Sequence, residues 1–141
     1  MSHDTVRFGF VCVQNAGRSQ MSAAFAEREI ERRGLGDRAA VLTGGTHPAD
    51  AVHDEVVETM RERDIDLSDR QPREVTTGEL NDCDVVATMG CSTLELDADV
   101  DTRDWDLTDP DGKAPDEVRA IRDEIEERVR ALFDERFGEA A

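Results

Sequence analysis

Tyrosine is absent from this chain of 141 residues, and lysine occurs only once, at Lys113, beside sixteen arginines. Acidic residues outnumber basic ones 34 to 17, so the formal net charge is −17. Such a surface repels phosphate backbones and anionic lipid headgroups, which excludes sequence-independent binding to nucleic acid or to anionic membranes. The imbalance is typical of a protein adapted to concentrated salt, which screens repulsion between carboxylates. An ordinary acidic enzyme is the alternative.

The sequence also has little of what export or metal binding requires. No apolar run approaches the roughly 20 residues of a membrane-spanning helix. The polar residues 1–4 lead directly into an apolar segment, so we expect no signal peptide and a cytoplasmic location. The three cysteines, Cys12, Cys83 and Cys91, form no C-x-x-C pair, and the three histidines lie outside any ligand cluster. We therefore expect neither a disulfide framework nor a metal site, and any functional cysteine is a nucleophile or a redox group.

Apolar runs alternate with helical patterns along the chain. Strands are predicted at 6–13, 39–43, 84–89 and 102–107, and helices at 19–33, 52–60 and 76–80. In the last helix apolar residues recur at spacings of three and four: Val118, Ile121, Ile125, Val129 and Leu132. This alternation favours right-handed crossovers and a parallel sheet. We predict one domain, 1–141, of the α/β class, a three-layer sandwich with a four-stranded parallel sheet flanked by helices.

The most informative motif places Cys12 at the end of the first strand and Arg18-Ser19 at the start of the next helix. Ligands of open α/β sheets bind outside the carboxyl ends of strands, and a helix N-terminus offers unpaired N–H groups with partial positive charge. We predict that the connecting loop curls its amides around one tetrahedral oxyanion, which Arg18 grips with its guanidinium. The loop residues are Val13, Gln14, Asn15, Ala16 and Gly17.

The same motif makes Cys12 the predicted nucleophile. A helix N-terminus and a nearby arginine favour the thiolate, and Ser19 is placed to donate its hydroxyl to the sulfur. Asn15 tolerates unusual backbone angles, and Gly17 allows an anion to approach closely. Asp109, in a later turn, is a candidate general acid for the departing oxygen. The alternatives are purely structural: a buried strand cysteine and an exposed turn aspartate.

Cys12 to Met21, read as CVQNAGRSQM, resembles the signature of the low-molecular-weight protein tyrosine phosphatase superfamily, and it is more similar to the arsenate reductases on that fold than to the phosphatases. The resemblance covers nearly the whole chain, with TGGTHP, DVVATMGC and DWDLTDPDGK in the family's order. Three features are similar to those of the reductase branch: Gln20 after Arg18-Ser19, the lack of tyrosines beyond Asp109, and the presence of Cys91 after the third strand. The resemblance implies a low-molecular-weight phosphatase-like fold and a general-acid role for Asp109.

The resemblance also implies that Cys12 attacks arsenate and that a second thiol completes the reduction. That thiol is Cys91, or an external one: a small cytoplasmic thiol or a thioredoxin- or glutaredoxin-like protein, with no bound cofactor. Related thioredoxin-linked enzymes carry two cysteines after the third strand, whereas residues 92–101 contain none. We therefore favour a single-cysteine or external-thiol mechanism, with Cys83 in a structural role and with Cys91 redox-active or merely buried.

Two other functions fit the same motif. A phosphatase would hydrolyse phosphomonoesters through a phosphocysteine on Cys12, with Asp109 activating water. A non-catalytic regulator would use the loop only to bind an oxyanion, but such a protein needs neither a nucleophile nor an acid. The sequence leaves His47 and His53 without an assigned role.

Overall fold

The computed structural model describes residues 5–89, 100–105, 107–108, 110 and 112–138. Its strands are β1 (Val6–Cys12), β2 (Ala39–Gly45), β3 (Val85–Met89) and β4 (Asp101–Asp104), all parallel, in the order β2-β1-β3-β4. Its helices are α1 (Arg18–Arg32), α2 (Asp54–Arg61), α3 (Thr77–Asn81) and α4 (Pro115–Phe137). The predicted α/β class and four-stranded parallel sheet are confirmed. None of the helices in these ranges has both the length and the apolar composition needed to cross a membrane.

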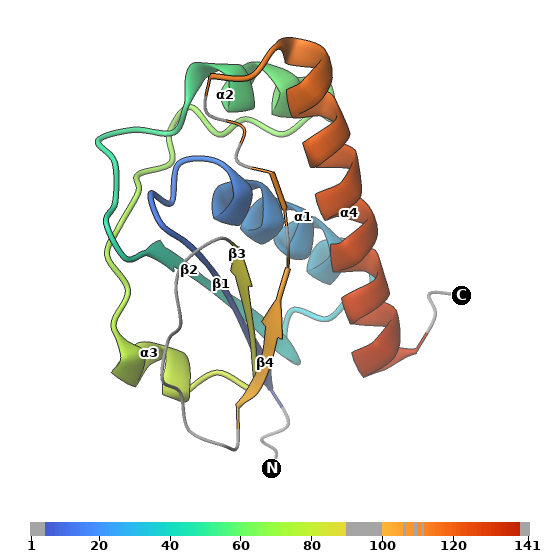
Figure 1. Cartoon of the computed structure of the whole chain (residues 1–141). Helices are drawn as coiled ribbons and strands as arrows, with labels where there is room; N and C mark the ends of the chain where they lie inside the picture. The colour runs from blue at the N-terminus through green and yellow to red at the C-terminus, as the bar shows by residue number, and fades with distance from the viewer. Residues whose placement is uncertain (1–4, 90–99, 106, 109, 111, 139–141) are drawn as a thin grey trace.

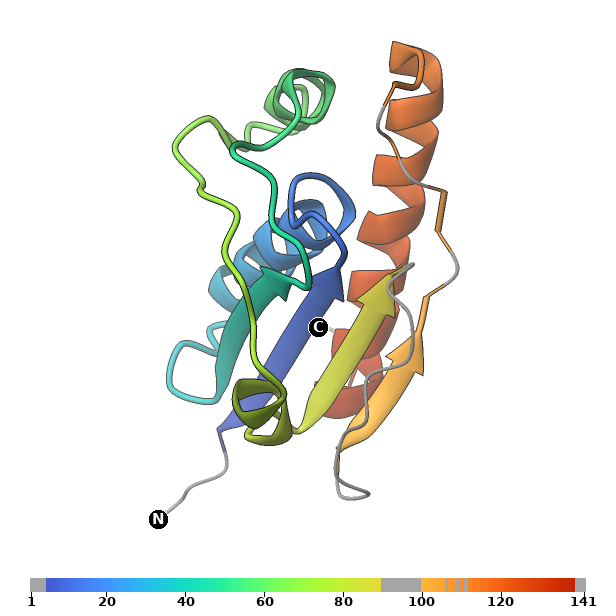
Figure 2. The same cartoon turned by 60° about the vertical axis from the view of Figure 1, so that its left-hand side comes forward.

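Helices lie on both faces of the sheet. The helices α1 and α4 pack together against one face (Figure 1), and Phe8 and Phe10 of β1 point into the core between them. The short helix α3 lies against the opposite face (Figure 2), where Val11, Leu80 and Val86 belong to a second, smaller cluster. Alternate residues of β1 therefore supply the two clusters, as the two-residue period of a strand requires.

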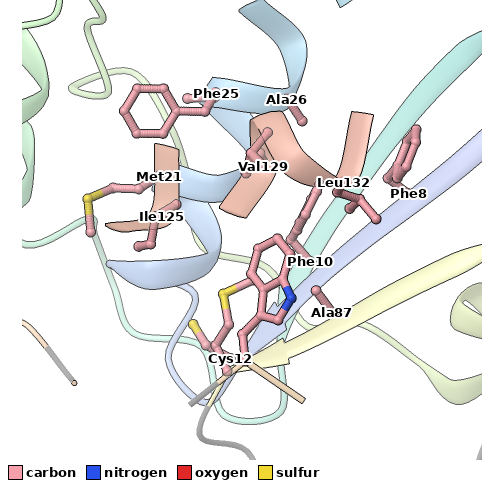
Figure 3. Packing of buried hydrophobic residues seen from close by; sticks show 14 of the residues in the cluster. Phe8, Phe10, Cys12, Met21, Phe25, Ala26, Ala87, Ile125, Val129 and Leu132 are labelled. Atoms are coloured by element: carbon pink, nitrogen blue, oxygen red, sulfur yellow. The ribbon is translucent and has the colours of Figure 1, made fainter. Parts of the chain in front are cut away.

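The larger core is built around aromatic residues of β1 and the apolar side of α4. Figure 3 shows Phe8 beside Leu132, with Cys12 at one end of the cluster. The rings of Phe8 and Phe133 stack with their centroids 4.7 Å apart. All five residues of the predicted apolar pattern on the last helix are buried: Val118, Ile121, Ile125, Val129 and Leu132. The amphipathic pattern therefore predicted the buried side of α4 correctly.

Three strands end at residues other than those predicted: the first ends at Cys12 instead of Val13, and the other two differences affect the site. The fourth strand ends at Asp104 instead of Leu107, because the chain turns toward the loop after β1, where the carbonyl of Leu107 accepts a hydrogen bond. The second strand continues to Gly45 because that residue pairs with the end of β1. A Cβ atom on Gly45 would lie 2.5 Å from the carbonyl oxygen of Val13, so only glycine allows the loop to pack there.

Arginine–carboxylate pairs connect the helices on the outside of the sheet. Glu62 accepts hydrogen bonds from Arg119 at 2.9 Å and Arg122 at 2.8 Å, and these bonds lower the pKa of Glu62 to about 2. Arg33, at the end of α1, reaches Asp134 of α4 at 2.8 Å. A planar guanidinium with five donors can serve two partners at once in fixed geometry, which accounts for arginine in these positions.

The stacked pair generates a prediction about stability. We expect Phe133→Ala to lower the free energy of unfolding by about 3–5 kcal/mol, because it removes a large buried ring and leaves a cavity. Urea denaturation of both proteins measures the difference. The control is Glu127→Ala on the exposed side of the same helix, with an expected change within about 0.5 kcal/mol. An equal effect of the two substitutions would contradict this description of the core.

Candidate active site

The loop 13–17 follows β1 at the carboxyl edge of the sheet. Cys12 ends β1 and is in register with Gly45 of β2 on one side and Met89 of β3 on the other. The chain leaves β1 toward β2, whereas β3 and β4 lie on the opposite side, so the strand order reverses beside β1. Open α/β sheets bind ligands in the crevice at such a reversal. The structure thus places Cys12 where a ligand site is expected.

Two donors surround the sulfur of Cys12. The backbone N–H of Asn15 donates to Sγ at 3.2 Å, and the Oγ of Ser19 lies 2.8 Å from it. Asn15 has a φ of 52°, a left-handed conformation that asparagine adopts more readily than most residues. Cys12 is 2% exposed, and Asn15 and Ser19 are fully buried. The thiol therefore lies inside a polar cage and not among apolar side chains alone.

The carboxamide of Asn15 directs a donor at the Ser19 hydroxyl that lies beside the Cys12 sulfur. Its Oδ1 accepts from the backbone N–H of Arg73 at 3.1 Å, and an N–H can only donate. The Nδ2 therefore faces the other way and donates to the Oγ of Ser19 at 2.7 Å and the Oγ1 of Thr43 at 3.0 Å. The Ser19 oxygen thus accepts one bond and has its own proton left for the Cys12 sulfur. A hydroxyl that donates to sulfur stabilises the thiolate relative to the thiol.

A second segment covers the outside of the loop and engages its carbonyl groups. Backbone N–H groups of residues 46–53 donate to loop carbonyls over distances between 2.8 and 3.2 Å. The pairs are Thr46 to Cys12, His47 to Val13, Ala49 to Gln14 and His53 to Ala16. By contrast, the N–H groups of Gln14, Ala16 and Gly17 donate to no residue that the structure describes. Backbone amides that are left without partners in one short loop can bind an anion.

A small hollow opens beside these amides. It is lined by Cys12, Gln14, Ala16, Gly17, Arg18 and His53. Among the described residues that line it, Arg18 carries a positive charge and none is a carboxylate, whereas the whole protein has a net charge of −17. The N-terminus of α1 adds partial positive charge at the same place. Anion binding is therefore favoured here in spite of the net charge.

Arg18 joins the loop to the segment that follows β4. Its Nη1 donates to the carbonyl of Leu107 at 3.1 Å. Nearby, a Cβ on Gly17 would lie 2.8 Å from the Cγ of Pro110, so that segment packs directly on the loop. Asp109 belongs to the same segment but lies outside the described residues, as does Cys91, and the roles of both stay predictions.

Cys83 is buried like Cys12 but differs from it in position and in hydrogen bonding. It lies just before β3, at the opposite end of that strand from the register position of Cys12, and its Sγ donates to the carbonyl of Glu79 at 3.7 Å. Burial, followed by the negative charge of Asp84, raises the pKa of the Cys83 thiol to about 11. The thiol therefore stays protonated at neutral pH, which suits the structural role that the sequence predicts.

Sequence reasoning missed the residues that orient Asn15. Thr43 and Arg73 are distant in the chain, and Arg73 acts through its backbone N–H, so its residue type carries no signal. His53, left without a role, lies at the hollow, with its Nε2 3.1 Å from the Oε1 of Gln14. In the part of the chain that the structure describes, no group of three His, Cys, Asp or Glu residues is placed to hold a metal ion.

The family model for low molecular weight phosphotyrosine protein phosphatases matches residues 7–140, so the chain belongs to this family. Within it, a protein of Halobacterium salinarum provisionally named an arsenate reductase is 70% identical over 96% of this chain and 96% of its own length. A glutaredoxin arsenate reductase of Synechocystis is 32% identical over 88% of this chain and 93% of its own.

A solved structure shows the same architecture. The thioredoxin-dependent arsenate reductase of Corynebacterium glutamicum superposes with a TM-score of 0.79 and 29% sequence identity. The match covers 96% of this chain and 63% of that one, so the bacterial protein is the longer of the two. The predicted membership of the superfamily, in its arsenate reductase branch, is confirmed by these similarities.

The Ser19 hydroxyl gives a direct test of the proton arrangement. We expect Ser19→Ala to move the midpoint of the pH dependence of Cys12 alkylation upward by about one pH unit, because the thiolate loses a charge-assisted hydrogen bond. Iodoacetamide labelling at several pH values, followed by peptide mass spectrometry, measures this midpoint. The control is Ser22→Ala on the same helix, since that buried hydroxyl donates to the Arg18 carbonyl and not to Cys12. An unchanged midpoint in Ser19→Ala would show that the hydroxyl does not serve the sulfur.

Proposed function

We propose that this chain is a thiol-dependent arsenate reductase. One observation carries the proposal: the sulfur of Cys12 accepts from the N–H of Asn15, lies 2.8 Å from the Ser19 hydroxyl, and lines the same hollow as Arg18 and the loop amides. A nucleophile and an anion cradle therefore share one small site. The names of the relatives from Halobacterium salinarum, Synechocystis and Corynebacterium glutamicum support arsenate as the anion.

In the first step, arsenate binds with its oxygens on the loop amides and on the guanidinium of Arg18. The Cys12 thiolate attacks arsenic, a sulfur–arsenic bond forms, and one arsenic–oxygen bond breaks. The departing oxygen takes up a proton and leaves as water. We assign that proton to Asp109, because its neighbour Pro110 packs on Gly17 and brings this segment to the loop.

In the second step, another thiolate attacks the sulfur of Cys12. The sulfur–arsenic bond breaks with its electron pair on arsenic, which passes from the +5 to the +3 state and leaves as arsenite. Cys12 and the attacking thiol are left as a disulfide. The thiol is Cys91 or an external donor, and the relatives named for glutaredoxin and thioredoxin support a thiol protein as that donor. The electrons come from thiols, so the scheme uses no bound cofactor.

Phosphomonoester hydrolysis uses the same first step and is the alternative. Phosphate and arsenate are both tetrahedral, so the cradle accepts either, and we expect slow hydrolysis of aryl phosphates as a side activity. Two observations favour the reductase assignment. One is the 70% identical relative, and the other is that the chain has no tyrosine that could line the rim of a site for an aromatic substrate.

The proposal predicts arsenate-dependent consumption of thiol by the wild-type protein. We expect Cys12→Ser to lose this activity at least about 1000-fold, because the nucleophile is gone. Cys83→Ala is the matched control and retains activity, since its buried thiol is protonated at neutral pH. Cys91→Ser distinguishes the two donors: it stops turnover if Cys91 attacks and leaves it unchanged with an external thiol. Equal rates for the wild type and Cys12→Ser would refute the proposal.

The contact between Gly17 and Pro110 gives a separate prediction. We expect Gly17→Ala to lower arsenate turnover about 10- to 100-fold, because the new methyl group displaces the segment that carries the proposed acid. Gly36→Ala is the control, since a Cβ there meets nothing within 4 Å. Steady-state rates of the two variants measure the effect, and unchanged turnover in Gly17→Ala would rule out a role for this contact.

A further inference from the structure

Gln20 is a buried polar residue that the chemistry described above does not use. It lies in the first turn of α1 with 1% of its surface exposed. Its Nε2 donates to the Oδ1 of Asn15 at 3.0 Å, and the backbone N–H of Arg73 donates to the same oxygen at 3.1 Å. With two bonds donated by its Nδ2, the carboxamide of Asn15 has all four of its hydrogen-bonding positions occupied.

The other end of the Gln20 side chain has no partner. Its Oε1 is buried and accepts no hydrogen bond from any residue that the structure describes. A buried acceptor without a donor lowers the stability of a protein, and an apolar side chain of similar volume would avoid this loss. Stability alone therefore does not account for glutamine at this position. What the residue provides is its one bond to Asn15.

That bond supports the orientation of the Asn15 amide that the Arg73 N–H sets. If the Asn15 amide turned by 180° while Gln20 kept its orientation, its Nδ2 would face the N–H of Arg73 and the Nε2 of Gln20, so that three donors would meet without an acceptor. Its Oδ1 would then face Ser19, and the Ser19 proton would be drawn to that oxygen and away from the sulfur of Cys12. Gln20 thus adds to two other constraints on this rotation: the N–H of Arg73, and the hydroxyl of Thr43, whose proton goes to the carbonyl of Phe10.

We infer that Gln20 is a positioning residue, which acts through Asn15 and Ser19 to keep a hydroxyl proton directed at the Cys12 sulfur. The inference rests on the proposed role of Cys12 as the nucleophile, and it holds for any oxyanion substrate. Gln20 touches neither the sulfur nor the hollow. Its effect is on the fraction of Cys12 present as thiolate at a given pH.

The test uses Gln20→Met, which keeps the volume and removes the amide. We expect the midpoint of Cys12 alkylation against pH to rise by about half to one pH unit, with a melting temperature equal to or above that of the wild type. Cys83 and Cys91 are replaced by alanine in all proteins, so that only Cys12 reacts. A lower melting temperature with an unchanged midpoint would show a merely structural role and overturn the inference. Gln20→Leu is measured in the same way if the methionine variant does not fold.

A second arm tests the route through Ser19. In the Ser19→Ala background, Gln20→Met has no hydroxyl proton to misdirect, so we expect no further shift of the midpoint. Additive shifts of the two substitutions would overturn the route. Ser22→Ala is again the control on the same helix, with the wild-type midpoint expected.

Alkylation needs no arsenate, so the proposed arsenate reductase activity and the positioning role of Gln20 can be refuted independently of each other. A wild-type protein that reduces no arsenate, with Gln20→Met still shifting the midpoint, would contradict the proposed function alone. A wild-type protein that reduces arsenate, with no shift in Gln20→Met, would contradict the positioning role alone.

Discussion

The hydrogen bond from the backbone N–H of Arg73 to the Oδ1 of Asn15 is the constraint on which the site depends. Because the backbone N–H of Arg73 can only donate, it fixes the orientation of the Asn15 amide. The Nδ2 of that amide then donates to the Ser19 oxygen, so the Ser19 proton can point to the Cys12 sulfur. A main-chain group far away in the sequence therefore orients the polar cage around this sulfur, and it is held in place by pairing of residues 73–75 with the end of β2.

Close packing at the carboxyl edge makes this arrangement possible. Gly45 has no side chain where the carbonyl of Val13 passes, and Gly44 has none where Val75 packs; a Cβ atom on either glycine would lie 2.5 Å from that neighbour. Gly17 accommodates Pro110 in the same way. Each of these three close contacts between segments distant in sequence thus depends on a residue that lacks a Cβ atom.

The net charge of −17 and a site for an anion are compatible because the two act over different distances. Salt screens the field of surface carboxylates over about 10 Å at 0.1 M. Inside the hollow the nearest groups are loop amides, the helix N-terminus and Arg18, all of which favour an anion. Local geometry therefore outweighs the overall charge at Cys12.

The sequence by itself determined the α/β alternation, the buried side of α4 and the identity of the loop 13–17, because periodicity and the spacing from Cys12 to Arg18 are local properties. Only the tertiary structure decided that Thr43, Arg73 and Gln20 converge on Asn15, since strand register and a main-chain donor leave no pattern in the residue types. The tertiary structure also decided that Pro110 packs against Gly17 of the loop. The physical reason is that local hydrophobic patterning specifies each element, whereas the direction of a hydrogen bond depends on every partner around it.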